Sequence, residues 1–201
     1  MALNIKCNLA NDLERSTSCG YSLPQIVELY LANFSDITAT TVGTPTGGQG
    51  LEVQSITMKT SGEGAQATTA KWYKVEPAVN SASWSDNLGV GGNGNKYKIH
   101  TVGFSFSSAY DSTMVDNVDS LALGKYVAVA RMVDGSYIML GRGAGLEAQA
   151  DGVNNSGTGD PTGEAGLVVS LTGNAVESAL PLSSAAIATV TGVSEQFVTT
   201  N

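Results

Sequence analysis

Apolar and polar residues alternate along much of this chain, which is the pattern of half-buried β-strands. In residues 97–107, Val102, Phe104 and Phe106 fall on one face, and small or hydroxyl residues occupy the other. Further strand candidates share this apolar, β-branched character; they are 25–34, 51–59, 70–76, 125–132, 136–143 and 165–173. The pattern predicts a mainly β protein, a barrel or sandwich of antiparallel strands.

Two of these segments carry a local signal of their own. In 25–34, Ser22 and Pro24 are typical of a helix start, whereas the apolar residues at every second position indicate a strand, which we favour. Asp134-Gly135 separates two apolar, β-branched runs. This dipeptide predicts a tight hairpin, because glycine adopts a positive φ without steric cost.

One α-helix is predicted, around residues 111–123. Met114, Val118 and Leu121 recur there at helical spacing, and Gly124 suits the left-handed position that ends a helix. Because strands precede and follow it, we expect a single helix flanking an antiparallel sheet.

Gly-, Ser- and Thr-rich stretches interrupt the strand pattern. Two of them surround the strand candidate 51–59, and together they predict a long protruding hairpin around 38–71. We expect the rest of the fold to form when residues 40–68 of this hairpin are deleted. Residues 151–164 predict a second irregular loop. We expect 1–201 to form a single barrel domain, with residues 183–201 as a C-terminal arm or last strand.

The acidic net charge limits the kinds of partner that this protein can bind. The chain has 18 acidic and 10 basic residues, a net charge of -8, and no Lys or Arg from Gly143 onward. Such a chain is a poor reader of duplex DNA, because phosphate contacts need clustered Lys and Arg. No apolar run reaches the roughly 18 residues of a membrane helix, and the start lacks the pattern of a secretory signal. Cys7 and Cys19 do not make a disulfide framework.

Candidate chemistry is sparse. The segment 141–145, GRGAG, lacks the Lys-Ser/Thr pair of a phosphate loop, so a strand exit is the better interpretation. The carboxylates near 111–119 and the oxygen-rich 151–160 lack the pattern of a calcium loop, and a solvated surface explains them. His100, the only histidine, has no ligand-spaced neighbour in sequence and indicates a structural or exposed role. We expect no enzyme, no cofactor and no metal.

The arrangement of elements resembles the tail tube proteins of tailed bacteriophages, and more distantly the tube proteins of contractile injection systems. The segment 19–37 supplies a strand before the Gly/Thr-rich hairpin. Residues 97–141 supply a strand, a helix and the Asp-Gly hairpin, and 163–182 a late strand that ends on a glycine turn. The resemblance covers most of residues 19–182.

The resemblance implies a structural virion protein, the major tail tube subunit, assembled in the bacterial cytoplasm. Six subunits would close into a ring, and rings would stack into a conduit for double-stranded DNA that is not bound specifically. Other tail or neck proteins would be partners, and a membrane would not. The residues expected at assembly interfaces are Val42, Leu51, Val53, Ile56, Met58, Trp72, Tyr73 and Trp84. Acidic residues expected to face the lumen are Asp151, Asp160 and Glu164.

Two alternatives remain open at this point. The protein could be a neck, terminator or adaptor protein that forms a single ring. It could also be a monomeric β-sandwich that binds carbohydrate, with Trp72, Tyr73 and Trp84 as a stacking platform. Arg131 and Arg142 interrupt an acidic lumen, and we expect them to pair with acids between subunits or to lie on the outer face.

Overall fold

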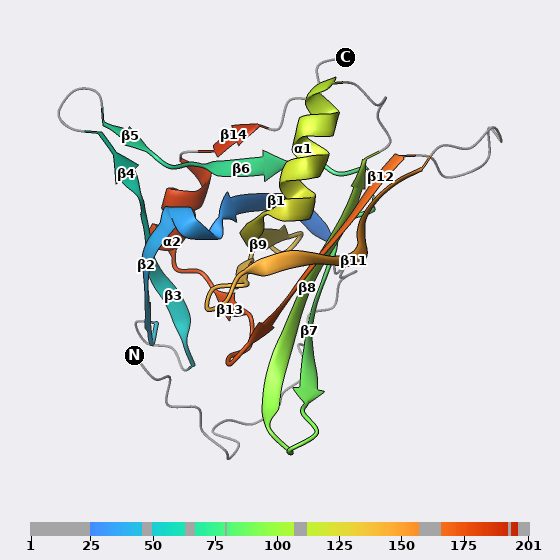
Figure 1. Cartoon of the computed structure of the whole chain (residues 1–201). Helices are drawn as coiled ribbons and strands as arrows, with labels where there is room; N and C mark the ends of the chain where they lie inside the picture. The colour runs from blue at the N-terminus through green and yellow to red at the C-terminus, as the bar shows by residue number, and fades with distance from the viewer. Residues whose placement is uncertain are drawn as a thin grey trace.

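Antiparallel strands dominate the structure, a computed structural model that describes residues 25–45, 50–62, 67–78, 80–106, 112–156, 166–192 and 194–196 (Figure 1). The elements in chain order are β1 (Ile26–Asn33), β2 (Ile37–Gly43), β3 (Glu52–Met58), β4 (Thr60–Ser61), β5 (Thr68–Thr69), β6 (Trp72–Val75), β7 (Ser83–Val90), β8 (Lys96–Phe106), α1 (Ser112–Leu123), β9 (Lys125–Met132), β10 (Tyr137–Leu140), β11 (Leu146–Ser156), β12 (Gly166–Ala175), β13 (Leu180–Pro181), α2 (Ser184–Thr191) and β14 (Ser194–Gln196). A short 3₁₀ turn, Phe34–Asp36, joins β1 to β2.

The main sheet is open at both ends. Its strands follow the order β14-β6-β1-β9-β11-β12-β8-β7, and β10 branches from β9 to pair with β13. All pairs are antiparallel except β14 with β6. The described strands do not close into a barrel, so of the two predicted architectures the sandwich-like one, with a flanking helix, is confirmed.

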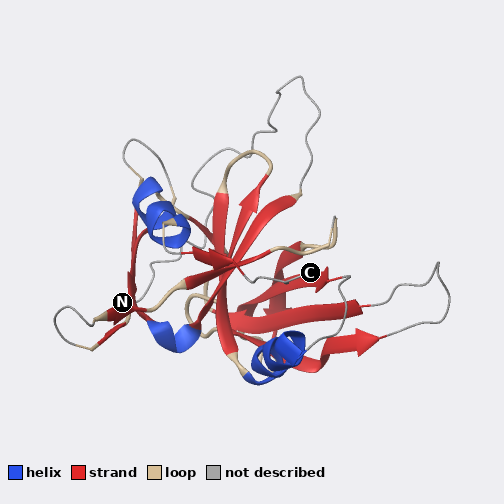
Figure 2. Ribbon diagram, turned by 90° about the horizontal axis from the view of Figure 1, so that it is seen from above, coloured by secondary structure: helices blue, strands red, loops and turns tan. Residues whose placement is uncertain are grey.

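Strands β1 and β9 form the middle of three layers. On one face, Leu29 and Ala128 join a core with the strands β8 and β12. On the other face, Tyr30 and Val129 join a second core with β3 and α2. Strands buried on both faces need apolar residues at consecutive positions, which explains why β1 and β9 lack a strict polar alternation. Figure 2 shows the strands and helices of the molecule from above.

The predicted flanking helix is confirmed as α1. Leu121 is buried, Val118 packs on the first core, and the Gly124 N–H donates to the Ser120 carbonyl at the end of the helix. Gly124 does not adopt a positive φ, so the expected left-handed position is wrong; the ring of Tyr126 occupies the space where its side chain would lie. The hydroxyl of Tyr126 donates to that same carbonyl. The side chain of Met114 lies outside the described residues.

The other local signals also hold. Residues 26–33 form a strand rather than a helix. At the Asp-Gly turn, Gly135 adopts φ +85°, and the Asp134 carboxylate accepts a hydrogen bond of 2.9 Å from the Ser136 N–H. The turn therefore joins β9 to β10 as the dipeptide predicts.

The segment 38–71 differs from the prediction of one protruding hairpin. It forms two successive hairpins, β2–β3 and β4–β5, and the first lies against the body while the second projects from it (Figure 1). Val53, Ile56 and Met58 are buried in the second core. Deleting 40–68 would remove these core residues, so the expectation that the rest of the fold survives this deletion is wrong.

Two other segments contain more helix or strand than the sequence predicts. β11 continues through the predicted loop to Ser156 and pairs with β12, with a bulge between Ala148 and Val153 where Asp151 adopts φ +62°. The bulge lets Asp and Gly residues stay within a paired strand. The segment 183–201, expected as an arm or a last strand, begins as α2, so the expectation of a single helix is wrong. The Ser183 hydroxyl caps this helix and Val190 is buried in the second core. The strand β14 follows it and pairs with β6.

Candidate functional site: a buried polar network and the surfaces around it

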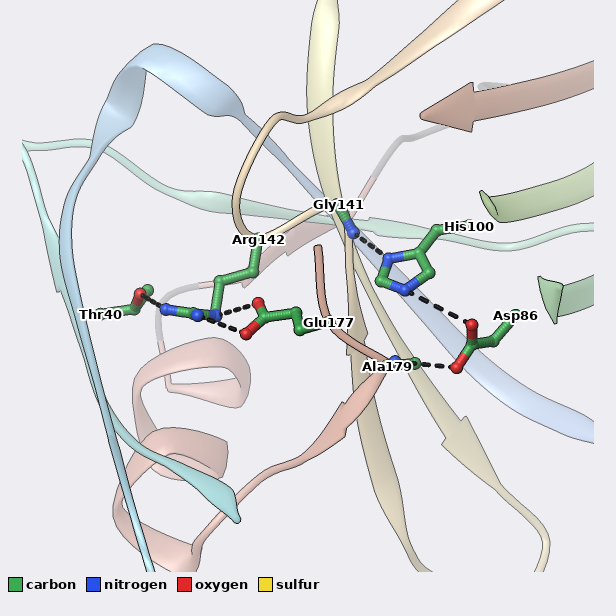
Figure 3. A network of polar contacts seen from close by, with 7 residues as sticks. All are labelled: Thr40, Asp86, His100, Gly141, Arg142, Glu177 and Ala179. Carbon is green, nitrogen blue, oxygen red and sulfur yellow. Dashed lines mark hydrogen bonds and ion pairs between the residues drawn. The ribbon is translucent and has the colours of Figure 1, made fainter. Parts of the chain in front are cut away.

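A buried ion pair ties together three segments that are far apart in sequence. Arg142, in the turn after β10, donates from Nε and Nη2 to the two carboxylate oxygens of Glu177, at 2.5 and 2.6 Å. Its Nη1 donates to the Thr40 hydroxyl of β2 at 2.9 Å (Figure 3). The two charged side chains are only 19% and 6% exposed. The pair therefore anchors the β2–β3 hairpin to the segment between β12 and β13.

The glycine-rich turn 141–145 positions this arginine. Gly141 and Gly145 adopt φ of +76° and +77°, and the Gly145 N–H donates to the Gly141 carbonyl at 2.8 Å. Only glycine adopts such angles without strain. The turn reverses the chain between β10 and β11, as the strand-exit interpretation of GRGAG predicts.

A second polar pair lies beside the first. The Gly141 N–H donates to His100 Nδ1 at 3.2 Å, so Nδ1 carries no proton and the neutral ring carries it on Nε2. Nε2 faces the Asp86 carboxylate, 3.8 Å from Oδ1. That carboxylate also contacts Lys98 Nζ at 3.2 Å and accepts from the Ala179 N–H at 3.1 Å (Figure 3). His100 is a buried structural residue, and sequence alone did not show that Asp86 lies opposite it on the neighbouring strand.

Stability should fall as the pH drops below about 6.5, the ordinary pKa of histidine. Burial lowers the pKa of His100 in the folded state, and the carboxylate of Asp86 offsets this only in part. The unfolded chain then binds a proton that the folded chain does not, so stability is full above pH 6.5 and declines below it. Unfolding in urea between pH 7.5 and 5.5 measures this decline.

The variant His100→Gln isolates the effect, because the chain has no other histidine. Its stability should change less over that pH range than that of the wild type. The ring-proton NMR signals of His100 give its pKa directly, and a value above 6.5 would contradict the prediction.

A third cluster crosses β6, β1 and β9. Glu28 contacts Lys74 Nζ at 3.4 Å and Arg131 Nη1 at 3.2 Å. Burial raises the pKa of Glu28, but hydrogen bonds from Tyr30 and Arg131 and the Lys74 charge outweigh it and lower the pKa overall. Arg131 and Arg142 thus both pair with glutamates of their own subunit, and the expected pairing between subunits is not needed to neutralise them.

The residues expected at assembly interfaces lie in different environments. Val53, Ile56, Met58 and Trp72 are buried inside the subunit and offer no surface to a neighbour. The remaining four have accessible surface, and their assembly role stays a prediction. They are Leu51, which is 37% exposed, and the half-buried Val42, Tyr73 and Trp84.

The structure describes only one of the three acidic residues that we expect to face the lumen. Asp151 is exposed at the β11 bulge, whereas Asp160 and Glu164 lie outside the described residues. In the base-free C-terminal third, Glu147 pairs with Lys125 at 2.6 Å and Glu177 pairs with Arg142. Part of the acidic charge in that third is therefore neutralised by bases from earlier in the chain.

The small and hydroxyl residues predicted on one face of 97–107 continue onto the two neighbouring strands as a broad uncharged face, which the sequence did not show. Strands β7, β8 and β12 turn one face toward the first core, and their register places small polar residues together on the other. There the hydroxyls of Thr101 and Thr172 lie 3.2 Å apart on adjacent strands. The polar members of this face on the three strands are Ser83, Ser85, Asn87, Thr101, Ser105, Ser170, Thr172 and Asn174. The alternation SWSDN in residues 83–87 was the available signal.

Within the ranges that the structure describes, no three His, Cys, Asp or Glu side chains gather closely enough to hold a metal ion. None of the described helices has the length and apolar character that crossing a membrane requires. Comparisons with protein-family models, with curated proteins and with solved structures found no match to this chain.

Proposed function

We propose that this protein is a structural subunit of a phage tail, the major tail tube protein, which forms stacked and hexameric rings around a DNA conduit. The observation that carries the proposal is the long edge of the main sheet at β7, whose outer side pairs with none of the described strands. The family resemblance given by the order of elements supplies the biological setting. The fold itself supports self-assembly without catalysis.

Strand β7 lacks the residues that usually protect an exposed sheet edge. Natural proteins block such edges with lysine, proline or a covering segment, because an unpaired row of N–H and C=O groups recruits other strands. The eight residues of β7 include neither lysine nor proline, and its one charged residue, Asp86, points to His100 in the interior. An edge of this kind suits pairing with a neighbouring subunit, which removes the free edge when a ring closes.

The uncharged face of β7, β8 and β12 supports the conduit. Lysine and arginine would hold the phosphates of passing DNA, and this face offers neither on the three strands. Hydroxyl and amide groups keep it hydrated. A wall of this composition would let DNA slide, and acidic residues such as Asp151 at its margin would add repulsion.

The carbohydrate-binding alternative loses its proposed platform. Trp72 is fully buried in the second core, whereas Trp84 packs against the first core. The two rings therefore cannot stack on one sugar. The single-ring alternative stays open, because a ring that does not stack needs the same edge.

Negative-stain electron microscopy with light scattering tests the proposal. Purified protein should form rings roughly 10 nm across, or tubes, a size on the order expected for six domains of this mass. Tubes favour the major tube protein, and separate rings favour the adaptor. A stable monomer at high concentration would contradict assembly of the chain by itself.

A substitution in β7 tests whether this edge strand forms the contact between subunits. Asn87→Lys places a charge on β7 and should abolish rings, because a charged edge strand resists pairing. Ser170→Lys puts the same charge on the same face, but on the interior strand β12, and should leave ring formation intact. Equal assembly by both variants would exclude β7 as the interface.

A further inference from the structure

The β7–β8 hairpin extends beyond the strand beside it. Pairing of β8 with β12 ends at Lys98 and Ala175, whereas pairing of β8 with β7 continues to Lys96 and Val90. Figure 1 shows this end of the hairpin projecting away from the other strands. We call residues 88–98, which run from the last position paired with β12 to the end of the hairpin, the overhang.

Among the described residues, the apolar side chains on the side of the overhang that continues the core face are mostly exposed. Alternation along β7 places Leu88 and Val90 on the same side as the core residue Trp84, and they are 61% and 60% exposed. The residues opposite them in register are Lys98 and Lys96. The overhang thus presents two aliphatic side chains beside two lysines.

The overhang has a cross-strand contact of its own. The ring of Tyr97 lies over Gly89, its partner in register, and any side chain at position 89 would collide with that ring. Cross-strand aromatic contacts of this kind stabilise hairpins. A rigid apolar tip loses little conformational entropy when it binds.

A surface groove lies at the opposite end of β7. Its volume is about 410 Å³, and its apolar lining comes from Ile26, Val27, Val75, Pro77, Ala78 and Ala82. The polar residues Gln25, Lys74, Glu76 and Asn80 also line it. Val27 is 52% exposed there. A cavity of about 150 Å³ holds the six carbons of benzene. The groove therefore has room for the seven side-chain carbons of one leucine and one valine.

We propose that the overhang of one copy of this chain seats in the groove of a second copy. Leu88 and Val90 contact the apolar floor, and Lys96 approaches Glu76, a groove residue whose side chain is 52% exposed and lies 3.9 Å from Lys74 Nζ. This contact is additional to the edge pairing of the proposed function and does not require that function to hold.

Geometry and charge favour a second copy as the occupant. Ala82 precedes β7 and Val90 ends it, so an eight-residue strand of about 27 Å separates the groove from the tip, and a subunit cannot fill its own groove. The lysine-bearing tip meets a chain of net charge -8. Two different patches in contact make a heterologous interface, which generates rings or filaments rather than closed pairs.

Disulfide trapping tests the contact in full-length protein in which Cys7→Ser and Cys19→Ser remove the native thiols. Val90→Cys and Val27→Cys are purified separately, mixed and oxidised. The expected product is a cross-linked dimer that contains one copy of each variant, because a disulfide needs Cα atoms within about 7 Å. Absence of the mixed dimer, or products of Val90→Cys with itself only, would overturn the proposal.

A second measurement does not depend on cross-linking. The double variant Leu88→Ser and Val90→Ser should weaken self-association at least tenfold in sedimentation velocity. Both residues are mostly exposed, so the fold should be retained. Leu123→Ser, at an 89% exposed position at the end of α1, is the matched control and should associate like the wild type. Equal association of both variants would contradict the contact.

The rate of thiol labelling at Val27→Cys identifies the occupant. It should fall as the protein concentration rises, because a second copy then covers the groove. Slow labelling that is independent of concentration would mean that the chain fills its own groove, and would overturn the proposal. Rings in the microscope without the mixed dimer would leave the proposed function standing and reject this contact alone.

Discussion

Replacing Arg142 with methionine should lower the free energy of unfolding by about 3–5 kcal/mol. The change leaves the carboxylate of Glu177, only 6% exposed, without its bidentate partner, and removes the hydrogen bond to Thr40. A buried charge without a partner is costly, because the protein does not replace the hydration that it lost. Urea unfolding followed by circular dichroism measures the loss.

Lys125→Met is the matched control. It breaks the pair with Glu147, in which the two side chains are 44% and 50% exposed, and a contact over the Phe34 ring. An exposed pair of this kind contributes about 1 kcal/mol or less. The double variant Arg142→Met with Glu177→Leu should recover much of the loss, because it leaves no unpaired charge. Equal effects of Arg142→Met and Lys125→Met would show that burial does not strengthen the first pair.

Replacing Trp72 with alanine should cost about 3–5 kcal/mol of stability, whatever the assembly state. The indole has no exposed surface and packs in the second core, near the apolar residues of β3 and α2. Its removal leaves a cavity that the surrounding side chains fill only in part. Thermal unfolding of dilute protein measures the loss without any contribution from subunit contacts.

Trp84→Ala provides the comparison for this variant. Trp84 is half-buried at the edge strand and packs against the first core from outside, so its loss should cost less. In the wild type, acrylamide should quench Trp84 and leave the fluorescence of Trp72 nearly unchanged. Strong quenching of the Trp84→Ala protein, in which Trp72 is the remaining tryptophan, would contradict the burial of that ring.

The Arg142–Glu177 pair also bears on assembly. It fixes the β2–β3 hairpin against the body, so the part of 38–71 that remains free to reach a neighbour is the β4–β5 hairpin. Loss of the pair would loosen the attachment of β2–β3 without touching β7. Its effect on rings therefore separates a role of the hairpin from a role of the sheet edge.

Much of the secondary structure followed from local pattern. Alternation with a period of two predicted β8, and helical spacing with a terminal glycine predicted α1. Asp134-Gly135 predicted the hairpin between β9 and β10. These signals are local because backbone geometry and the choice of buried face depend on residues within a few positions.

The placement of single residues was less predictable. The Gly/Ser/Thr-rich flanks of β3 suggested a free hairpin, yet Val53 is fully buried, because the cap of Ser183 begins a helix that covers β3. Nothing near Arg142 in sequence identifies Glu177 as its partner, 35 residues away. Asp86 and His100 meet because β7 and β8 pair in one particular register.

The sequence by itself determined a mainly β chain, one flanking helix, a tight Asp-Gly turn and an acidic balance. Only the tertiary structure decided that the described strands form an open sheet, that Trp72 faces the interior, and that Leu88 and Val90 at the end of β7 are exposed. The physical reason is that strand order and layer packing depend on contacts between distant segments. A period-two pattern shows that a strand has two faces, and the neighbouring layers decide which face is buried.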